Sequence, residues 1–107
     1  MIQVLLELDE RGCLLSFEAS GHASCGPKGH DIVCAAVTVL LRTTVQALDS
    51  VRFETAAERR GFLTFRVMGY DEEQTERLRY AADFLWLGIA SLQEEYPQAV
   101  QCKKIKR

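Results

Sequence analysis

The sequence predicts an α+β fold in which two main helices cover one mixed β-sheet, forming a two-layer sandwich. Three observations predict it: two pairs of segments that alternate apolar and polar residues, a helical segment after each pair, and one more alternating segment near the C-terminus. The predicted order is ββαββαβ, and strand pairs that alternate with helices favour a sheet with a helical layer. Residues 1–107 are expected to form a single domain, because no repeat or linker interrupts them.

The first strand pair occupies residues 2–19. Ile2, Val4 and Leu6 share one face of the first segment, which is the period-two pattern of a half-buried strand. Turn residues follow at 9–12, and Phe17 and Ala19 then alternate with polar residues. This segment is predicted to be a hairpin.

The first helix is predicted from Ile32 to about Leu48. A glycine-rich loop precedes it, and Asp31 is a suitable N-cap at the point where the loop ends. The first turns after Asp31 are apolar on almost every side, so we expect this helix to be the most buried one in the fold.

The second half of the chain repeats the strand-pair and helix order. Residues 51–55 and 63–67 alternate as a second hairpin, and apolar residues recur at helical spacing from about Glu72 to Glu95. Pro97 ends that helix, and residues 99–105 are predicted to form a short edge strand.

Composition narrows the classes of function. A formal net charge of -2 gives no field that would attract nucleic acid, so no direct nucleic-acid binding is expected despite a basic C-terminus. The chain begins without a secretory pattern, and its longest apolar run, residues 32–41, is too short to cross a membrane. A cytoplasmic protein with no membrane contact is expected.

Both histidines and two of the four cysteines lie between His22 and Cys34. If Asp31 caps the helix, Cys34 is its third helical residue, where unpaired backbone N–H groups and the helix dipole favour a thiolate. His22 lies on the preceding loop, which can fold back to serve as the general base and acid. The same N–H groups would then form an oxyanion hole, and Asp31 would be a candidate for orienting His22.

A metal site and a purely structural role for this cluster also stay open on spacing alone. His22, Cys25, His30 and Cys34 supply two nitrogens and two sulfurs, enough for a tetrahedral zinc site, although the two ligand pairs are unusually close together. Alternatively, Cys34 is a core residue, because free cysteine is among the most buried residue types.

The segment from residue 21 to 37 closely resembles the signature of the ribosomal-processing cysteine protease family, Prp. The matching residues are Gly21, His22, Ala23, Gly26, Gly29 and the run from Asp31 to Val37. The resemblance implies a homodimeric α+β cysteine endopeptidase that removes the short N-terminal extension of a bacterial large-subunit ribosomal protein. It implies that Cys34 is the nucleophile, that His22 is the general base, and that a mobile loop contains Gly21, Gly26 and Gly29.

The resemblance also bears on the other residues of the cluster. The family pattern does not require a cysteine at position 25, which makes the zinc set a coincidence, so no metal and no cofactor are expected. Thr38 stands where the family commonly has serine, and it keeps a hydroxyl one turn beyond Cys34. The dimer interface is expected on the second helix or the last strand.

Two alternatives without peptidase activity remain. One is a zinc-stabilised module that uses the four ligands of the cluster. The other is a ribosome-associated assembly factor that binds through the basic residues 103–107.

Overall fold

In the computed structural model, strands β1 (Ile2–Leu8), β2 (Leu14–Ser20), β3 (Arg52–Ala56), β4 (Phe62–Gly69) and β5 (Val100–Lys106) form one sheet. The structure describes residues 1–21, 29–57 and 61–107, with the backbone alone at 29–31. The strand order is β3-β4-β2-β1-β5. The β1–β5 pair is parallel and the other pairs are antiparallel, which confirms the predicted mixed sheet.

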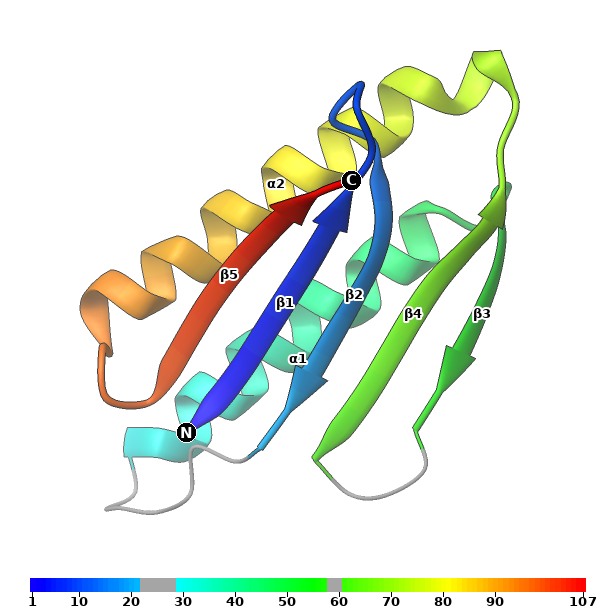
Figure 1. Cartoon of the computed structure of the whole chain (residues 1–107). Helices are drawn as coiled ribbons and strands as arrows, with labels where there is room; N and C mark the ends of the chain where they lie inside the picture. Colours follow the sequence, from blue (N-terminus) through cyan, green and yellow to red (C-terminus); the bar gives the residue numbers. More distant parts are fainter. Residues whose placement is uncertain (22–28, 58–60) are drawn as a thin grey trace.

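The helical layer consists of α1 (Gly29–Ala47) and α2 (Thr75–Glu95), and a short 3₁₀ turn, η1 (Glu72–Gln74), leads into α2. Figure 1 shows both helices on the same face of the sheet, running in opposite directions, so the two-layer α+β sandwich is confirmed. No described element covers the other face of the sheet (Figure 1). None of the described helices is long and apolar enough to span a membrane.

The core lies between the sheet and the helices. The period-two pattern sends alternate strand residues into it: Leu6 pairs with Phe17 across β1 and β2, and Phe17 pairs with Phe65 across β2 and β4. The Phe17 and Phe65 rings stack with their centroids 5.1 Å apart. From the helices, Val37 and Leu85 are among the side chains that close this core. Burial of such side chains supplies most of the driving force for this fold.

The first helix is buried on one side only, although its first turns are apolar on almost every side. Ile32 and Val39 on α1 are largely exposed, because α1 packs with one side against the core and turns the opposite side outward. The apolar residues of α1 therefore form two faces and not one.

The β1–β2 turn is held by Asp9. Its carboxylate accepts hydrogen bonds from the backbone N–H groups of Arg11 and Cys13, each 2.9 Å long, and from the hydroxyl of Tyr70. Burial is the largest influence on Asp9 and opposes its ionisation, but the hydrogen bonds together outweigh it, so the pKa of Asp9 is lowered. The hydrogen bond to Asp9 also raises the pKa of Tyr70 to about 12.

Replacing Tyr70 by phenylalanine (Tyr70→Phe) is expected to lower the free energy of unfolding by roughly 1.5–3 kcal/mol at pH 7, because a hydrogen bond to a charged group is lost. A carboxyl with a lowered pKa contributes stability above its unfolded pKa of about 3.9 and loses it as the pH falls through the folded value. The variant should therefore show a weaker decline in stability below about pH 4. Urea titrations at several pH values measure this, with the exposed Tyr80→Phe as control. Equal losses in both variants would contradict the role given to Tyr70.

Candidate active site

Cys34 lies near the start of α1, but deeper in the helix than predicted. The helix begins at Gly29, so Asp31 is its third residue and not the N-cap, and Cys34 is its sixth. The observed helix start differs from the predicted one because an acidic residue is favourable inside the first turn as well as at the N-cap. Inside the first turn it faces the positive end of the helix dipole. Gly29, which was expected in the loop, is the first residue of the helix.

Because α1 begins at Gly29, the backbone N–H groups without a helical partner belong to other residues than the prediction assumed. The first four N–H groups of a helix have no partner within it, and here they belong to residues 29–32. The N–H of Cys34 comes later and has a carbonyl one turn back as its helical partner. The predicted oxyanion hole beside Cys34 therefore does not follow from this helix end, and any such donors lie about one turn before the nucleophile.

The Cys34 side chain is half-buried and packs against the core. It occupies the edge of the buried face of α1, next to Val33 and Val37, which point fully inward. A fully buried thiol would be shielded from a substrate, and a fully exposed thiol would lack neighbouring side chains that could bind the substrate. The intermediate position suits a nucleophile better than it suits a simple core residue. Thr38, one turn further along α1, is exposed.

Gly21 is the last described residue before His22, and its backbone is closely held. Its φ of +95° lies in the left-handed region, which favours glycine. Its N–H donates a hydrogen bond of 2.9 Å to the carbonyl of Gly61, at the start of the segment that leads into β4. A Cβ at this position would lie 2.2 Å from the carbonyl oxygen of Met1. The chain therefore enters the loop through a position that only glycine fits.

The remaining predicted site residues are not described. His22, Cys25 and Gly26 lie in the segment 22–28, and the side chains of His30 and Asp31 are likewise outside the described part. Of the predicted site residues, the structure places Cys34 and Thr38 one turn apart on α1, and Gly21 directly after β2. The pairing of His22 with Cys34, the orienting role of Asp31 and the four-ligand zinc set stay predictions.

Two other cysteines differ sharply from Cys34. Cys13 is 0% exposed and Cys102 is 7% exposed. Burial is the main cause that raises the pKa of both thiols, to about 11 for Cys102. These thiols therefore hold their protons at neutral pH and are covered by the fold.

We expect a small alkylating reagent at pH 7.5 to modify Cys34 at least roughly tenfold faster than Cys13 or Cys102. The half-buried Cys34 is accessible in the folded chain, whereas the other two require local opening and deprotonation. Peptide mapping by mass spectrometry after timed quenching gives the three rates, and the same mapping in denaturant is the control. Equal rates for the three thiols in the folded protein would contradict the accessibility assigned to Cys34.

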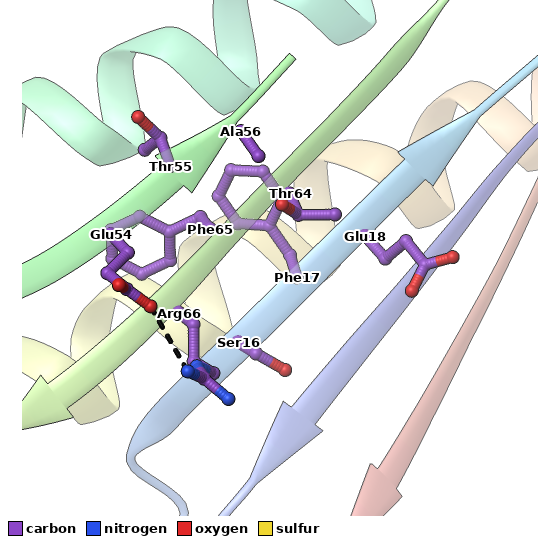
Figure 2. Close-up of a pocket in the computed structure, with 9 residues that line it drawn as sticks. All are labelled: Ser16, Phe17, Glu18, Glu54, Thr55, Ala56, Thr64, Phe65 and Arg66. Atoms are coloured by element: carbon purple, nitrogen blue, oxygen red, sulfur yellow. Dashed lines mark hydrogen bonds and ion pairs between the residues drawn. The ribbon is translucent and has the colours of Figure 1, made fainter. Parts of the chain in front are cut away.

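A separate cavity of about 420 Å³ lies on the face of the sheet opposite the helices. Figure 2 shows its lining from β2, β3 and β4, including the ion pair between Arg66 and Glu54 at 3.1 Å. Glu18 and Thr64 belong to this face because they alternate with the core residues of their strands. None of its lining residues comes from α1, so this cavity is not part of the site at Cys34.

Comparison with known proteins identifies a matching family and several solved structures with a similar fold. The profile of a family described as "Cysteine protease Prp" matches residues 1–101. No curated protein matches the chain significantly.

Solved structures resemble the whole chain. SMU.848 from Streptococcus mutans is 31% identical, with a TM-score of 0.81 over 100% of this chain and 96% of that one. The ribosomal processing protease Prp from S. aureus, in complex with a covalently linked product peptide, is 23% identical, with a TM-score of 0.80 over 98% of this chain and 100% of that one. The same S. aureus protein in complex with a substrate peptide is 22% identical, with a TM-score of 0.80 and the same coverage.

Proposed function

The chain belongs to the cysteine protease Prp family, and from this premise we propose that it is an endopeptidase with a dyad of Cys34 and His22. Its proposed substrate is the short N-terminal extension of a bacterial large-subunit ribosomal protein. The single observation that carries the proposal is the family match over residues 1–101, and the half-buried Cys34, the proposed nucleophile, lies within that range.

The proposed reaction is acyl transfer through Cys34. His22 takes the proton from the Cys34 Sγ, and the thiolate attacks the scissile carbonyl carbon to form a tetrahedral oxyanion. The C–N bond breaks as His22 returns the proton to the leaving amine, which leaves a thioester on Cys34. His22 then activates a water molecule that hydrolyses the thioester and restores the thiol.

The proposed substrate is supported by the S. aureus protein, which is described as a ribosomal processing protease and was crystallised with substrate and product peptides. The sequence identity to the S. aureus protein is 22–23%, and at this level the structural similarity supports a shared fold. The ribosomal substrate of the present chain is therefore part of our proposal. We further propose that the protein works in the cytoplasm, where ribosomal proteins are made, and that it is a homodimer.

Incubating the purified protein with the ribosomal precursor of its own organism tests the proposal. Mass spectrometry should show one cut that releases an N-terminal fragment and should show no fragments from unrelated unfolded proteins. Elemental analysis of the same preparation separates the zinc alternative, because a structural site would hold about one zinc per chain. Zinc at that level together with an intact precursor would overturn the peptidase proposal.

A further inference from the structure

Positive charges lie along one edge of the sheet, on strand β5 and directly after it. The basic residues in this segment are Lys103, Lys104, Lys106 and Arg107. β5 is the terminal strand of the sheet, and it pairs with β1 as far as Lys106. The N–H of Arg107 then donates a hydrogen bond of 2.8 Å to the carbonyl of Leu8. Strand pairing therefore sets the positions of these cations, which do not belong to a frayed segment.

The cations lie on both faces of β5. Cys102 points into the core with 7% exposure, and alternation places Lys104 and Lys106 on the same side of the strand. The side chain of Lys104 confirms this, because its Nζ lies 4.5 Å from the ring centroid of Trp86 on α2. Lys103 is out of phase with these residues and lies on the open face of the sheet. A partner at this edge would therefore meet positive charge on both faces.

Helix α2 extends the positive surface beside β5. Arg79, Trp86 and Gln93 are spaced by seven residues, about two helical turns, so they lie on one side of α2. The Gln93 Oε1 accepts a hydrogen bond of 2.7 Å from the N–H of Cys102, and Trp86 contacts Lys104, so this side faces β5. Figure 1 shows α2 running beside β5. We give the name basic edge to four exposed cations of this region: Arg79, Lys103, Lys104 and Lys106.

The basic edge has little local neutralisation. Arg107 forms an ion pair with Glu7 and is therefore left out of the basic edge. Among the residues that the structure describes, no carboxylate lies within 4 Å of the charged groups of the basic edge. Asp83 lies one turn further along α2 than the arginine of the basic edge, and Glu18 lies two strands away from β5. The four cations therefore keep a net positive charge at neutral pH.

The basic edge has the features of a surface for a linear polyanion. Lysines act as point charges that contact phosphate groups without reading a base sequence. The half-buried ring of Trp86 lies within the strip, and aromatic rings among cations are typical of surfaces that bind single-stranded nucleic acid. The formal net charge of -2 averages this strip with acidic residues elsewhere, so composition alone predicted no nucleic-acid contact.

We propose that the basic edge binds the phosphate backbone of RNA without sequence specificity. RNA is favoured over an anionic membrane because a membrane-binding surface carries several large apolar side chains, and within the described strand β5 only Ile105 is exposed in this way. β5 ends on the side of the molecule away from the start of α1 (Figure 1), so bound RNA leaves Cys34 open to a peptide. The proposal does not rest on the peptidase chemistry.

Fluorescence anisotropy of a labelled single-stranded RNA of roughly 20 nucleotides, titrated with the full chain at several salt concentrations, tests this proposal. Four phosphate contacts predict a slope of about -3 for the logarithm of affinity against the logarithm of salt concentration, with a Kd of roughly 1–100 μM. Lys104→Gln and Lys106→Gln should each make the slope less steep by about 0.7. The triple variant that also contains Lys103→Gln should lose most of the binding.

Arg66→Gln is the matched control, because Arg66 is an exposed cation on β4 that is paired with Glu54 and lies outside the basic edge. It should leave the affinity for RNA and the salt slope unchanged. Circular dichroism and thermal unfolding check that all variants are folded, as expected for changes at exposed positions. Cys34→Ala should bind RNA as the wild type does, so that failure of the peptidase proposal and failure of this one are separate results.

Four results would overturn the proposal. They are no RNA binding by the wild type at low salt, affinity that does not change with salt, full binding by the triple variant, and an equal loss in Arg66→Gln. Competition separates RNA from other polyanions. Unlabelled RNA should displace the probe, whereas equal displacement by polyglutamate or by vesicles of anionic phospholipid at the same charge concentration would contradict the assignment to RNA.

Discussion

Replacing Cys34 by alanine (Cys34→Ala) is expected to lower the rate of precursor cleavage by on the order of 10⁴–10⁶-fold. Without the sulfur no thioester forms, and the remaining residues can only bind and orient the peptide. Cys34 is half-buried and lies at the edge of the core, so the loss of its side chain should cost little stability. The measurement is precursor cleavage followed by mass spectrometry at equal concentrations of folded enzyme.

Two further variants show whether the loss is chemical. Cys102→Ala removes a buried cysteine that the mechanism does not use, and it should retain the cleavage rate even if it lowers stability. His22→Ala should reduce cleavage by roughly 10²–10⁴-fold and should also slow the alkylation of Cys34, because the general base is lost. A Cys34→Ala protein that gives the same products as the wild type would show that the nucleophile is elsewhere.

Replacing Gly21 by alanine (Gly21→Ala) is expected to impair both stability and cleavage. The left-handed φ of +95° costs a residue with a Cβ about 1–2 kcal/mol. The new Cβ would also lie 2.2 Å from the Met1 carbonyl oxygen, so the backbone must shift. Because His22 follows directly, a displacement of about 1 Å would lower kcat by on the order of 10²-fold.

Gly12→Ala is the matched control for this prediction. Gly12 has a similar φ of +84°, but a Cβ there would meet nothing within 4 Å. It should therefore show only the backbone strain, with a modest loss of stability and unchanged cleavage. Thermal unfolding, kcat and KM of both variants make the comparison. If Gly21→Ala cleaves as fast as Gly12→Ala, the close approach to Met1 does not position the loop entry.

The strands were predictable from the sequence because alternation is a local signal. Residues 2–8 were predicted and observed as a strand, and the predicted alternation at 51–55, 63–67 and 99–105 matches β3, β4 and β5 to within two residues. The order of the strands and the parallel pairing of β5 with β1 were not predicted, because they depend on contacts between segments far apart in the chain. The outward face of α1 was missed for a related reason: an apolar helix does not reveal how many of its sides the fold covers.

Of the predicted dyad, the structure describes Cys34, and the pairing of Cys34 with His22 stays a prediction. The spacing of His22 and Cys34, together with the family signature, identified the cysteine that the structure places at the edge of the core. The helix start at Gly29 was missed because a polar residue such as Asp31 fits both an N-cap and a first turn. The steric clash that requires glycine at position 21 could not be predicted from the sequence either, because it involves Met1, twenty residues earlier in the chain.

Rapid-quench measurement of the intact protein mass during precursor cleavage is the most direct test of the Cys34 mechanism. The mechanism predicts a transient species in which the released N-terminal fragment is joined to Cys34 as a thioester. This species should be sensitive to hydroxylamine, should appear before the free fragment, and should be absent in Cys34→Ala. Cleavage that proceeds with no acyl group on Cys34, or with one on another residue, would contradict it.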